Sequence, residues 1–262
     1  MNILNCFKVV SDLDLLGEGD WIADEQNNVD VSFVRTGWNC FDESALEMLL
    51  KLSDLSEGFN VMYNLSALTI GNEKCDTYLK TLYALGYQKA VRIDCENDLR
   101  FCSDFVAGLI AQYVGDQGNI DVIITGKQSA DGENGQTPFL LAEQLGWPHI
   151  GQVTMIEPVD ETCLKVRTVT DEGEVTQTIK IPCILSVGNA PNSYLRVPTL
   201  KDRLRLGKQP IEVRKVENQG AAGQGLLKLR AIDYRRAGII IEGDSPEEKA
   251  AVLFRQYLKE RL

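Results

Sequence analysis

Short apolar runs alternate with segments of helical periodicity through the first 145 residues, and this alternation constrains the fold more than any other feature. The apolar runs predict strands at residues 3–10, 60–65, 90–94 and 121–125. Between and after them, apolar residues three or four positions apart predict helices at residues 41–52, 72–85, 99–114 and 136–145. This βαβα order favours a doubly wound α/β fold, with a mostly parallel sheet covered by helices on both faces.

The pattern changes after Pro148. Strands are predicted at residues 152–157, 164–170 and 175–181, the last two as an antiparallel hairpin, and residues 183–187 could return to the main sheet. Residues 188–243 carry little periodic signal and predict an extended arm. Ser245 followed by Pro246 is typical of a helix start, so a terminal helix is predicted. We therefore predict an α/β domain at residues 1–194 and an arm with a terminal helix at residues 195–262.

Charge is divided unevenly between these two parts. Residues 1–194 carry 29 acidic and 12 basic side chains, whereas residues 195–236 carry 4 acidic and 11 basic ones. The excess of negative charge in residues 1–194 would repel phosphodiester backbones, which argues against a nucleic-acid partner. The basic stretch is either a solvated segment or an arm that docks on another protein.

Several classes of protein are excluded by composition. No apolar run approaches the roughly 18 residues that a membrane span needs. The first residues lack a secretory pattern, and the seven cysteines include no C-x-x-C pair, so we expect a cytoplasmic protein with reduced thiols. His149 is the single histidine, which argues against a zinc site and a catalytic histidine.

The segment most suggestive of chemistry follows the strand at residues 121–125. Gly126, Gly132 and Gly135 would let the backbone approach a ligand closely, and uncharged polar residues surround them. Ligands bind at the carboxyl ends of strands in such folds, and the helix start near Thr137 could hold a phosphate. A polar loop with a favourable helix start is the alternative, and the residue pattern alone leaves both open. Neither a Walker A loop nor a G-x-G-x-x-G motif is present.

An ordered set of motifs resembles the β subunits of electron transfer flavoproteins. GKQSADGENGQT at residues 126–137 is similar to their nucleotide-binding loop, which reads approximately GKQ-x-x-D-x-x-x-x-Q-T. Residues 5–8 resemble the end of their first strand, and residues 39–43 resemble their N-P-x-[DC]-E helix start. Asn64 is taken as the end of the second strand, and Leu85-Gly86 matches the residues before the third. The resemblance spans most of residues 1–200.

This resemblance implies a Rossmann-like fold of the adenine nucleotide α-hydrolase type and a role as an electron carrier rather than an enzyme. The β subunit pairs with a larger α subunit that holds most of the working FAD, and the heterodimer carries electrons from a flavin-dependent, acyl-CoA type dehydrogenase to an acceptor. The β subunit itself binds AMP, or a second FAD in electron-bifurcating members. The cofactor-binding residues implied here are Cys6, Lys8, Asn39, Cys40, Phe41, Asp42, Asn64, Gly126, Lys127, Gln128, Asp131, Gly132, Asn134, Gly135, Gln136 and Thr137.

Two departures from the family pattern concern the ligand and the partner. Asp131-Gly132 stands where AMP-binding members carry Asp-Asp, and a glycine there would leave room for FAD. Residues 189–196 resemble the loop that presents a leucine to dehydrogenases. Asn189 occupies the anchoring position, and Tyr194, Leu195 and Arg196 follow nearby as candidate docking residues.

Two other functions were weighed from the residues. A ligase or hydrolase of the nucleotide α-hydrolase type usually carries S-G-G-x-D-S after strand one, whereas residues 7–12 are FKVVSD. A nucleotide sensor of the stress-protein type needs G-x-x-G-x9-G-[ST] near the last strand, and this spacing is missing. Both remain alternatives to the electron carrier.

Overall fold

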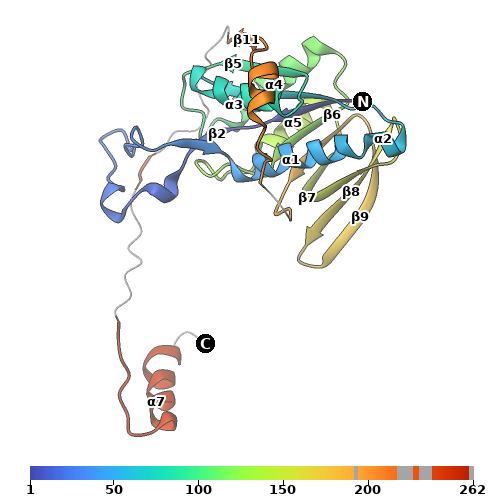
Figure 1. Cartoon of the computed structure of the whole chain (residues 1–262). Coiled ribbons are helices and arrows are strands. Elements are labelled where there is room, and N and C mark those ends of the chain that lie inside the picture. Colours follow the sequence, from blue (N-terminus) through green and yellow to red (C-terminus); the bar gives the residue numbers. More distant parts are fainter. Residues whose placement is uncertain (192–193, 217–226, 230–237, 260–262) are drawn as a thin grey trace. The chain divides into compact units, whose positions relative to one another are not determined.

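The computed structural model describes residues 1–191, 194–216, 227–229 and 238–259 (Figure 1). It comprises two compact units, Met1–Lys228 and Leu229–Leu262. The first is built on a nine-stranded sheet of order β11-β5-β4-β1-β6-β10-β7-β8-β9. Its strands are β1 (Asn2–Cys6), β4 (Asn64–Gly71), β5 (Lys89–Asp94), β6 (Val122–Gly126), β7 (His149–Pro158), β8 (Cys163–Thr170), β9 (Gly173–Lys180), β10 (Cys183–Val187) and β11 (Glu212–Lys215).

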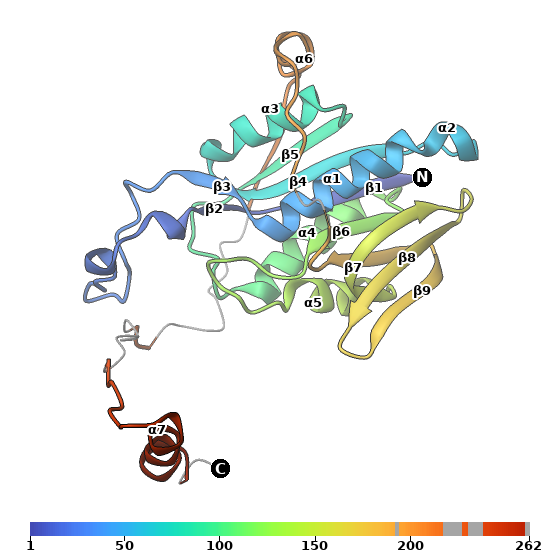
Figure 2. The same ribbon diagram turned by 60° about the horizontal axis from the view of Figure 1, so that its bottom comes forward.

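Helices cover both faces of the sheet (Figure 2). On one face lie α1 (Cys40–Asp54) and α3 (Asp76–Ala84), and on the other lie α4 (Ser103–Gln117) and α5 (Thr137–Leu145). Side chains of β1 alternate between these layers, because Ile3 packs with α1 and Leu4 packs with α4 and α5. The predicted doubly wound α/β fold is therefore confirmed.

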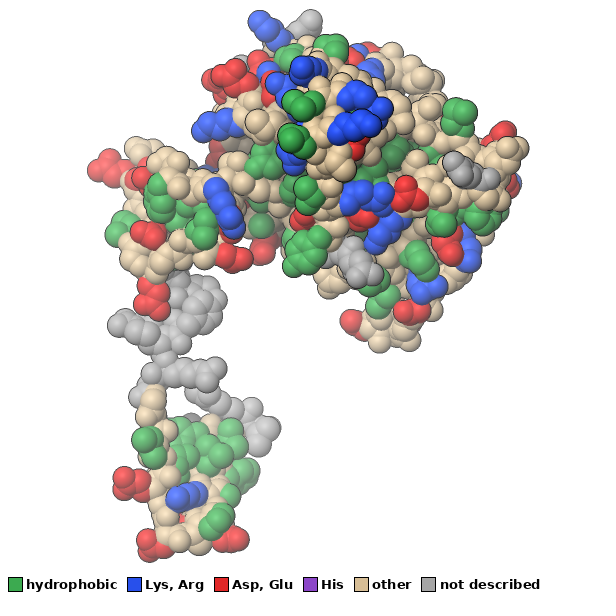
Figure 3. Space-filling model, in the orientation of Figure 1, with side chains coloured by type: hydrophobic (Ala, Val, Ile, Leu, Met, Phe, Trp, Pro, Cys, Tyr) green, Lys and Arg blue, Asp and Glu red, His purple; other side chains and the backbone are tan. Residues whose placement is uncertain are grey.

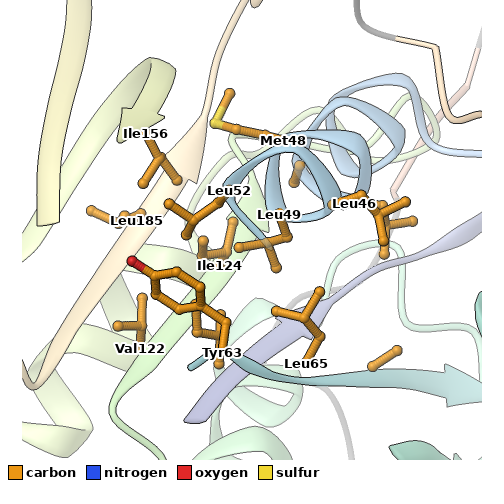
Figure 4. Packing of buried hydrophobic residues seen from close by; sticks show 14 of the residues in the cluster. Leu46, Met48, Leu49, Leu52, Tyr63, Leu65, Val122, Ile124, Ile156 and Leu185 are labelled. Atoms are coloured by element: carbon orange, nitrogen blue, oxygen red, sulfur yellow. The ribbon is translucent and has the colours of Figure 1, made fainter. Parts of the chain in front are cut away.

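The larger apolar cluster fixes α1 on the sheet. Leu46, Leu49 and Leu52 are completely buried. Figure 4 shows Leu49 and Leu52 near Ile124 and Leu185, which belong to the neighbouring strands β6 and β10, while Leu46 lies farther along the helix. Burying a leucine side chain contributes about 2 kcal/mol, so these leucines hold α1 on the sheet.

The antiparallel hairpin and the return of residues 183–187 to the main sheet are also confirmed. Strands β8 and β9 pair from Cys163↔Lys180 to Thr170↔Gly173. Strand β10 pairs in parallel with β6 on one side and β7 on the other. The tight turn Asp171–Glu172 between β8 and β9 is closed by Gly173, whose φ of 136° suits glycine.

Three predicted segments need correction. The run at residues 3–10 is two strands, because β1 ends at Cys6 and β2 (Val9–Ser11) pairs with β3 (Thr36–Trp38) in a separate antiparallel ribbon. The second strand of the main sheet is β4, not residues 60–65. The stretch at residues 188–243 contains the helix α6 (Leu200–Leu206) and the strand β11, which adds to the sheet beside β5.

Residues 12–35 form a lobe between β2 and β3, visible in dark blue in Figure 1. It contains the 3-10 turns η1 (Leu13–Leu15) and η2 (Glu18–Asp20) and a bridge between Ala23 and Val29. The Arg35 guanidinium pairs with Asp12 at 2.8 Å where the lobe joins the ribbon. This irregular structure agrees with the absence of periodicity in the sequence.

The second unit contains α7 (Pro246–Leu253), followed by a π-helical turn at Phe254–Leu258. The Ser245 hydroxyl accepts the backbone N–H of Glu248 at 3.2 Å, so the predicted N-cap is confirmed. Ala251, Phe254, Leu258 and Leu262 are apolar residues at helical spacing in the sequence. The first three lie in the described residues, and Leu262 lies outside them; Phe254 and Leu258 are exposed. Among the described residues, no helix has the length and apolar character of a membrane span.

Candidate functional site

The candidate site lies at the carboxyl edge of the sheet, where the strand order reverses. From β1 the chain proceeds through α1 to β4 on one side, while β6 lies on the other side of β1. The segments that follow β1 and β6 are therefore neighbours, as expected at a ligand-binding switch point. The Lys8 ammonium after β1 pairs at 2.8 Å with the Asp131 carboxylate after β6.

Asp42, in the first turn of α1, connects these two segments. Its Oδ2 accepts the backbone N–H of Lys8 at 2.9 Å, and its Oδ1 accepts that of Gly126 at 2.6 Å. The side chain is buried, and burial raises the pKa of its carboxyl group from 3.8 to about 6. Asp42 therefore joins the ends of β1 and β6 from the helix above them.

Asn39, immediately before α1, extends this network to the loop after β6. Its amide nitrogen donates to Asp42 Oδ2 at 2.9 Å and to the Gln128 carbonyl at 2.8 Å. Its Oδ1 is buried without a partner among the described residues. A buried acceptor of this kind normally finds a donor, so it marks a place for a water molecule or a ligand group.

The loop between β6 and α5 depends on close backbone packing. At Gly126, an added Cβ would lie 2.6 Å from Asp42 Oδ1 and 2.7 Å from the Phe41 Cβ. The Lys127 ammonium lies 4.6 Å from the centroid of the Phe41 ring, a cation–π contact. Gly135 has a φ of 60°, the left-handed region that favours glycine. The predicted glycine-dependent loop is thus present before α5.

Arg100, which follows β5, supports the middle of this loop. Its carbonyl accepts the Asn134 amide N–H at 3.0 Å, and an added Cβ on Gly132 would lie 2.4 Å from the same oxygen. Its guanidinium pairs with Asp98 and donates to Asn28 of the lobe at 3.0 Å. Gly132 is therefore required by a backbone neighbour, which weakens the sequence argument that this glycine makes room for a larger ligand.

The two cysteines of the predicted site differ in accessibility. Cys6 is buried, and burial together with the charge of Asp42 raises the pKa of its thiol. Cys40 is exposed at the first residue of α1, although partial desolvation also raises the pKa of its thiol. Both therefore favour the neutral thiol, and neither resembles an activated nucleophile.

Asn64 does not lie at this site. It begins β4, pairs in register with Asn2, and its amide donates to the Asn2 side chain at 2.9 Å. Because β1 and β4 are parallel, Asn64 lies at the amino edge of the sheet, opposite Cys6. Its placement at the end of the second strand is wrong, and the residues at that end are Ile70 and Gly71.

The remaining loop residues occupy the rim of the site. Gln136 precedes α5, whose first helical residue is Thr137, and its backbone N–H donates to the Asn134 side chain at 3.3 Å. Pro138 follows and has no N–H, which leaves fewer free donors at the helix start than the sequence suggested. A ligand here would depend on loop amides, side chains and the Thr137 hydroxyl.

The residues proposed for docking do not share one environment. Arg196 pairs with the buried Glu47 at 2.9 Å and with Asp54 at 2.9 Å, and the Leu195 N–H donates to Glu43 at 3.2 Å. Leu195 also packs against the core. Asn189 and Tyr194 are exposed, and Tyr194 exposes 83% of its surface. The chain therefore packs Leu195 against the core, ties the exposed Arg196 to α1 by ion pairs, and presents Tyr194 outward.

Two residues with important contacts were missed in the sequence. Arg100 fell inside the helix predicted at residues 99–114, whereas α4 begins at Ser103, and neither Arg100 nor Glu47 was proposed as a site residue. Each acquires its role from residues distant in the chain, Gly132 and Arg196 respectively. The spacing of apolar residues carries no signal for such contacts.

The chemistry of this site is that of binding. Lys8, Lys127, Gln128, Asn134 and Thr137 provide cationic or uncharged donors, while Asp42 and Asp131 are engaged with the chain's own donors. The described part of the chain contains no group of three or more His, Cys, Asp or Glu side chains suited to a metal ion.

Comparison with known proteins identifies the family. The electron transfer flavoprotein domain matches residues 30–218. The chain is 35% identical to the "Putative electron transfer flavoprotein subunit YgcR" of Escherichia coli (strain K12), over 100% of this chain and 99% of that protein. It is 27% identical to the electron transfer flavoprotein subunit beta of Bacillus subtilis (strain 168), over 80% and 81% of the two chains. It is 25% identical to the electron transfer flavoprotein subunit beta of Dictyostelium discoideum, over 84% of this chain and 86% of that protein. The chain belongs to the electron transfer flavoprotein family.

Proposed function

We propose that this chain is the small, β-type subunit of an electron transfer flavoprotein and binds an adenine nucleotide between the segments that follow β1 and β6. The observation that carries this proposal is the network of Lys8, Asp42 and Gly126 at the switch point, which holds the loop after β6 beside the end of β1. A flavin supplies the redox chemistry of such a heterodimer. The role of this chain is to bind, orient and dock.

AMP is the nucleotide we favour for this subunit, with the working FAD shared with the larger α subunit. A monophosphate needs few cations. Lys8 follows β1 and Lys127 follows β6, so each places an ammonium group at this edge of the sheet. The Arg100 carbonyl fills the space in which a side chain at position 132 would lie. Gly132 therefore gives no separate support for a second FAD. If this chain instead belongs to an electron-bifurcating protein, FAD will replace AMP.

The experiment is co-expression of the full chain with an α subunit encoded beside its gene. A yellow complex that co-purifies, followed by release of its nucleotides and identification by mass, should give one FAD and one AMP per heterodimer. Two FAD would favour a bifurcating protein. A stable, colourless chain that associates with no α subunit and releases no nucleotide would refute the proposal.

A dehydrogenase is the proposed electron donor, and its docking surface on this chain would include Tyr194, Val197, Leu200 and Leu204, here called the docking patch. Each exposes more than half of its surface, and Val197 exposes 82%. Figure 3 shows hydrophobic side chains beside Lys and Arg side chains in the region of α6 (Leu200–Leu206). Clustered apolar residues with basic neighbours suit an acidic partner.

Val197→Glu tests this docking patch. Because Val197 lies apart from the nucleotide loop, the variant should keep its FAD and AMP content but lose at least tenfold in the rate of reduction by the dehydrogenase. Val175→Glu, on the exposed strand β9, makes the same substitution at another exposed valine and should leave the rate within twofold. Equal rates for wild type and Val197→Glu would exclude this patch.

A further inference from the structure

Asp42 differs from the other candidate site residues because the chain already engages both of its carboxylate oxygens. Only 6% of the residue is exposed. Its three donors are the Lys8 N–H at 2.9 Å, the Gly126 N–H at 2.6 Å and the Asn39 amide at 2.9 Å. These donors belong to the end of β1, the end of β6 and the residue before α1.

Each donor is linked in turn to the loop at residues 126–137. Lys8 pairs through its side chain with Asp131, and Asn39 donates to the Gln128 carbonyl. Gly126 is itself the first residue of the loop. One carboxylate therefore determines where three separate attachments of the loop lie.

The close contact with Gly126 shows that this arrangement is specific. An added Cβ at this position would lie 2.6 Å from Asp42 Oδ1 and 2.9 Å from the Asp42 backbone nitrogen. Such separations are shorter than van der Waals contact, so a side chain there would push α1 away from β6. Glycine at position 126 is what allows the carboxylate to reach the strand end.

We propose that Asp42 is a positioning residue for the nucleotide site: it fixes the segments after β1 and β6 relative to α1, and it does not contact the nucleotide. This proposal rests on the nucleotide site of the proposed function and assigns a distinct role within it. A carboxylate in direct contact with a phosphate would be repulsive. With its charge directed at three N–H groups, Asp42 stabilises the loop without facing the ligand.

Asp42→Asn is the decisive variant. Asparagine keeps the shape of the side chain but places an NH2 group where one carboxylate oxygen accepts a donor. An N–H would then face the N–H of Lys8 or Gly126, and one of these attachments would be lost.

Asp121→Asn is the matched control. Asp121 Oδ2 accepts the backbone N–H of Asn2 at 2.6 Å, so it makes the same kind of contact with the same strand, β1, at its opposite end. Loss of this contact should destabilise the fold without disturbing the carboxyl edge. The two variants therefore separate a general effect on the fold from an effect on the site.

The measurements use the full chain freed of nucleotide, titrated with AMP and with FAD by calorimetry, together with its thermal unfolding and amide hydrogen exchange. We expect Asp42→Asn to weaken binding of the preferred probe at least tenfold and to speed exchange at Lys8 and Gly126. Asp121→Asn should keep the affinity within twofold while lowering the unfolding temperature. Gly126→Ala, which displaces Asp42 without removing its charge, should also weaken binding and serves if Asp42→Asn does not fold.

Three results would overturn the inference. Asp42→Asn could bind the probe as tightly as wild type, or Asp121→Asn could lose as much affinity as Asp42→Asn. In Asp42→Asn, faster amide exchange at Asn2 as well as at Lys8 would show that the whole fold is destabilised and that the effect is not local to the site. If the wild-type chain binds neither AMP nor FAD, the proposed nucleotide site itself fails, and that outcome is distinct from the others.

Discussion

Replacing Gly126 with alanine should destabilise the protein by about 2 kcal/mol, although the change adds only one methyl group. The new Cβ would lie 2.6 Å from Asp42 Oδ1, 2.7 Å from the Phe41 Cβ and 2.9 Å from the Asp42 nitrogen. All three atoms belong to the first turn of α1, which the buried leucines hold on the sheet. Because the neighbours are backbone and short side chains, they cannot rotate away, and overpacking of this kind costs about 1–3 kcal/mol.

Gly115→Ala is the control with the opposite sign. Gly115 lies inside α4, and an added Cβ there meets no atom within 4 Å. Alanine in a helix interior is more favourable than glycine by about 0.5–1 kcal/mol, so this variant should be more stable than wild type. The two substitutions are chemically identical and differ in their surroundings alone.

Both variants would be compared with wild type by urea unfolding and by calorimetric melting of the full chain. For a chain of this size, 1 kcal/mol corresponds to about 2–4 °C, so Gly126→Ala should melt roughly 4–8 °C lower and Gly115→Ala about 2 °C higher. If Gly126→Ala melted at the wild-type temperature, or shifted in the same direction as Gly115→Ala, the packing described at the start of α1 would be wrong.

Three further predictions concern charge and thiol chemistry. Arg196→Ala removes the guanidinium that pairs with the buried Glu47 carboxylate, which keeps only the backbone N–H of residue 196, and should cost about 2 kcal/mol in urea unfolding, whereas the neighbouring exposed Tyr194→Ala should cost little. Because burial raises the pKa of Asp42 from 3.8 to about 6, ionising this carboxyl group costs more in the folded chain than in the unfolded one, and the extra stability present at low pH is lost as the pH rises through 6. Relative to Asp42→Asn, wild type should therefore gain about 1.4 kcal/mol between pH 7.5 and pH 5, and a constant difference would contradict this. Of the seven cysteines, all in the described residues, Cys40 alone is exposed; a thiol reagent should modify one group rapidly, and Cys40→Ala should remove that phase.

The central strands could be predicted from the sequence because their burial is continuous. Strand β6 consists of five buried residues and β10 of five more, and each is bounded by polar or glycine residues. The second strand was predicted too early in the chain, at residues 60–65, because the residues on both sides of the start of β4 include apolar, buried ones. Val61 and Tyr63 are almost completely buried although neither belongs to a strand. Burial alone does not show where strand pairing begins.

The elements α6 and β11 could not be predicted because their stability comes from contacts outside themselves. Helix α6 has seven residues, none of them buried, and β11 has four. Strand β11 is held by pairing with β5 and by Arg214, which lies 4.6 Å from the Tyr113 ring centroid and pairs with Asp116 at 2.7 Å. Such elements are too short to show a period, and isolated helices of this length are unstable.

Much of the candidate site was predictable because strand ends and glycine spacing are local features. The roles within it were not. Asp42 was expected to touch the nucleotide, yet its contacts with Lys8 and Gly126 exist only after β1, β6 and α1 have assembled. Arg100 gave no signal because its carbonyl, rather than its side chain, contacts Gly132.

The position of β10 has a consequence for synthesis of the chain. This strand lies between β6 and β7, yet it is made after the whole β7–β9 meander. Until residues 183–187 have left the ribosome, β6 and β7 each present an open edge at the middle of the sheet. Unpaired strand edges can pair with other polypeptides, so a nascent or truncated chain that stops before Cys183 should aggregate. In a chain that extends past Val187, β10 pairs with both β6 and β7 and covers these edges.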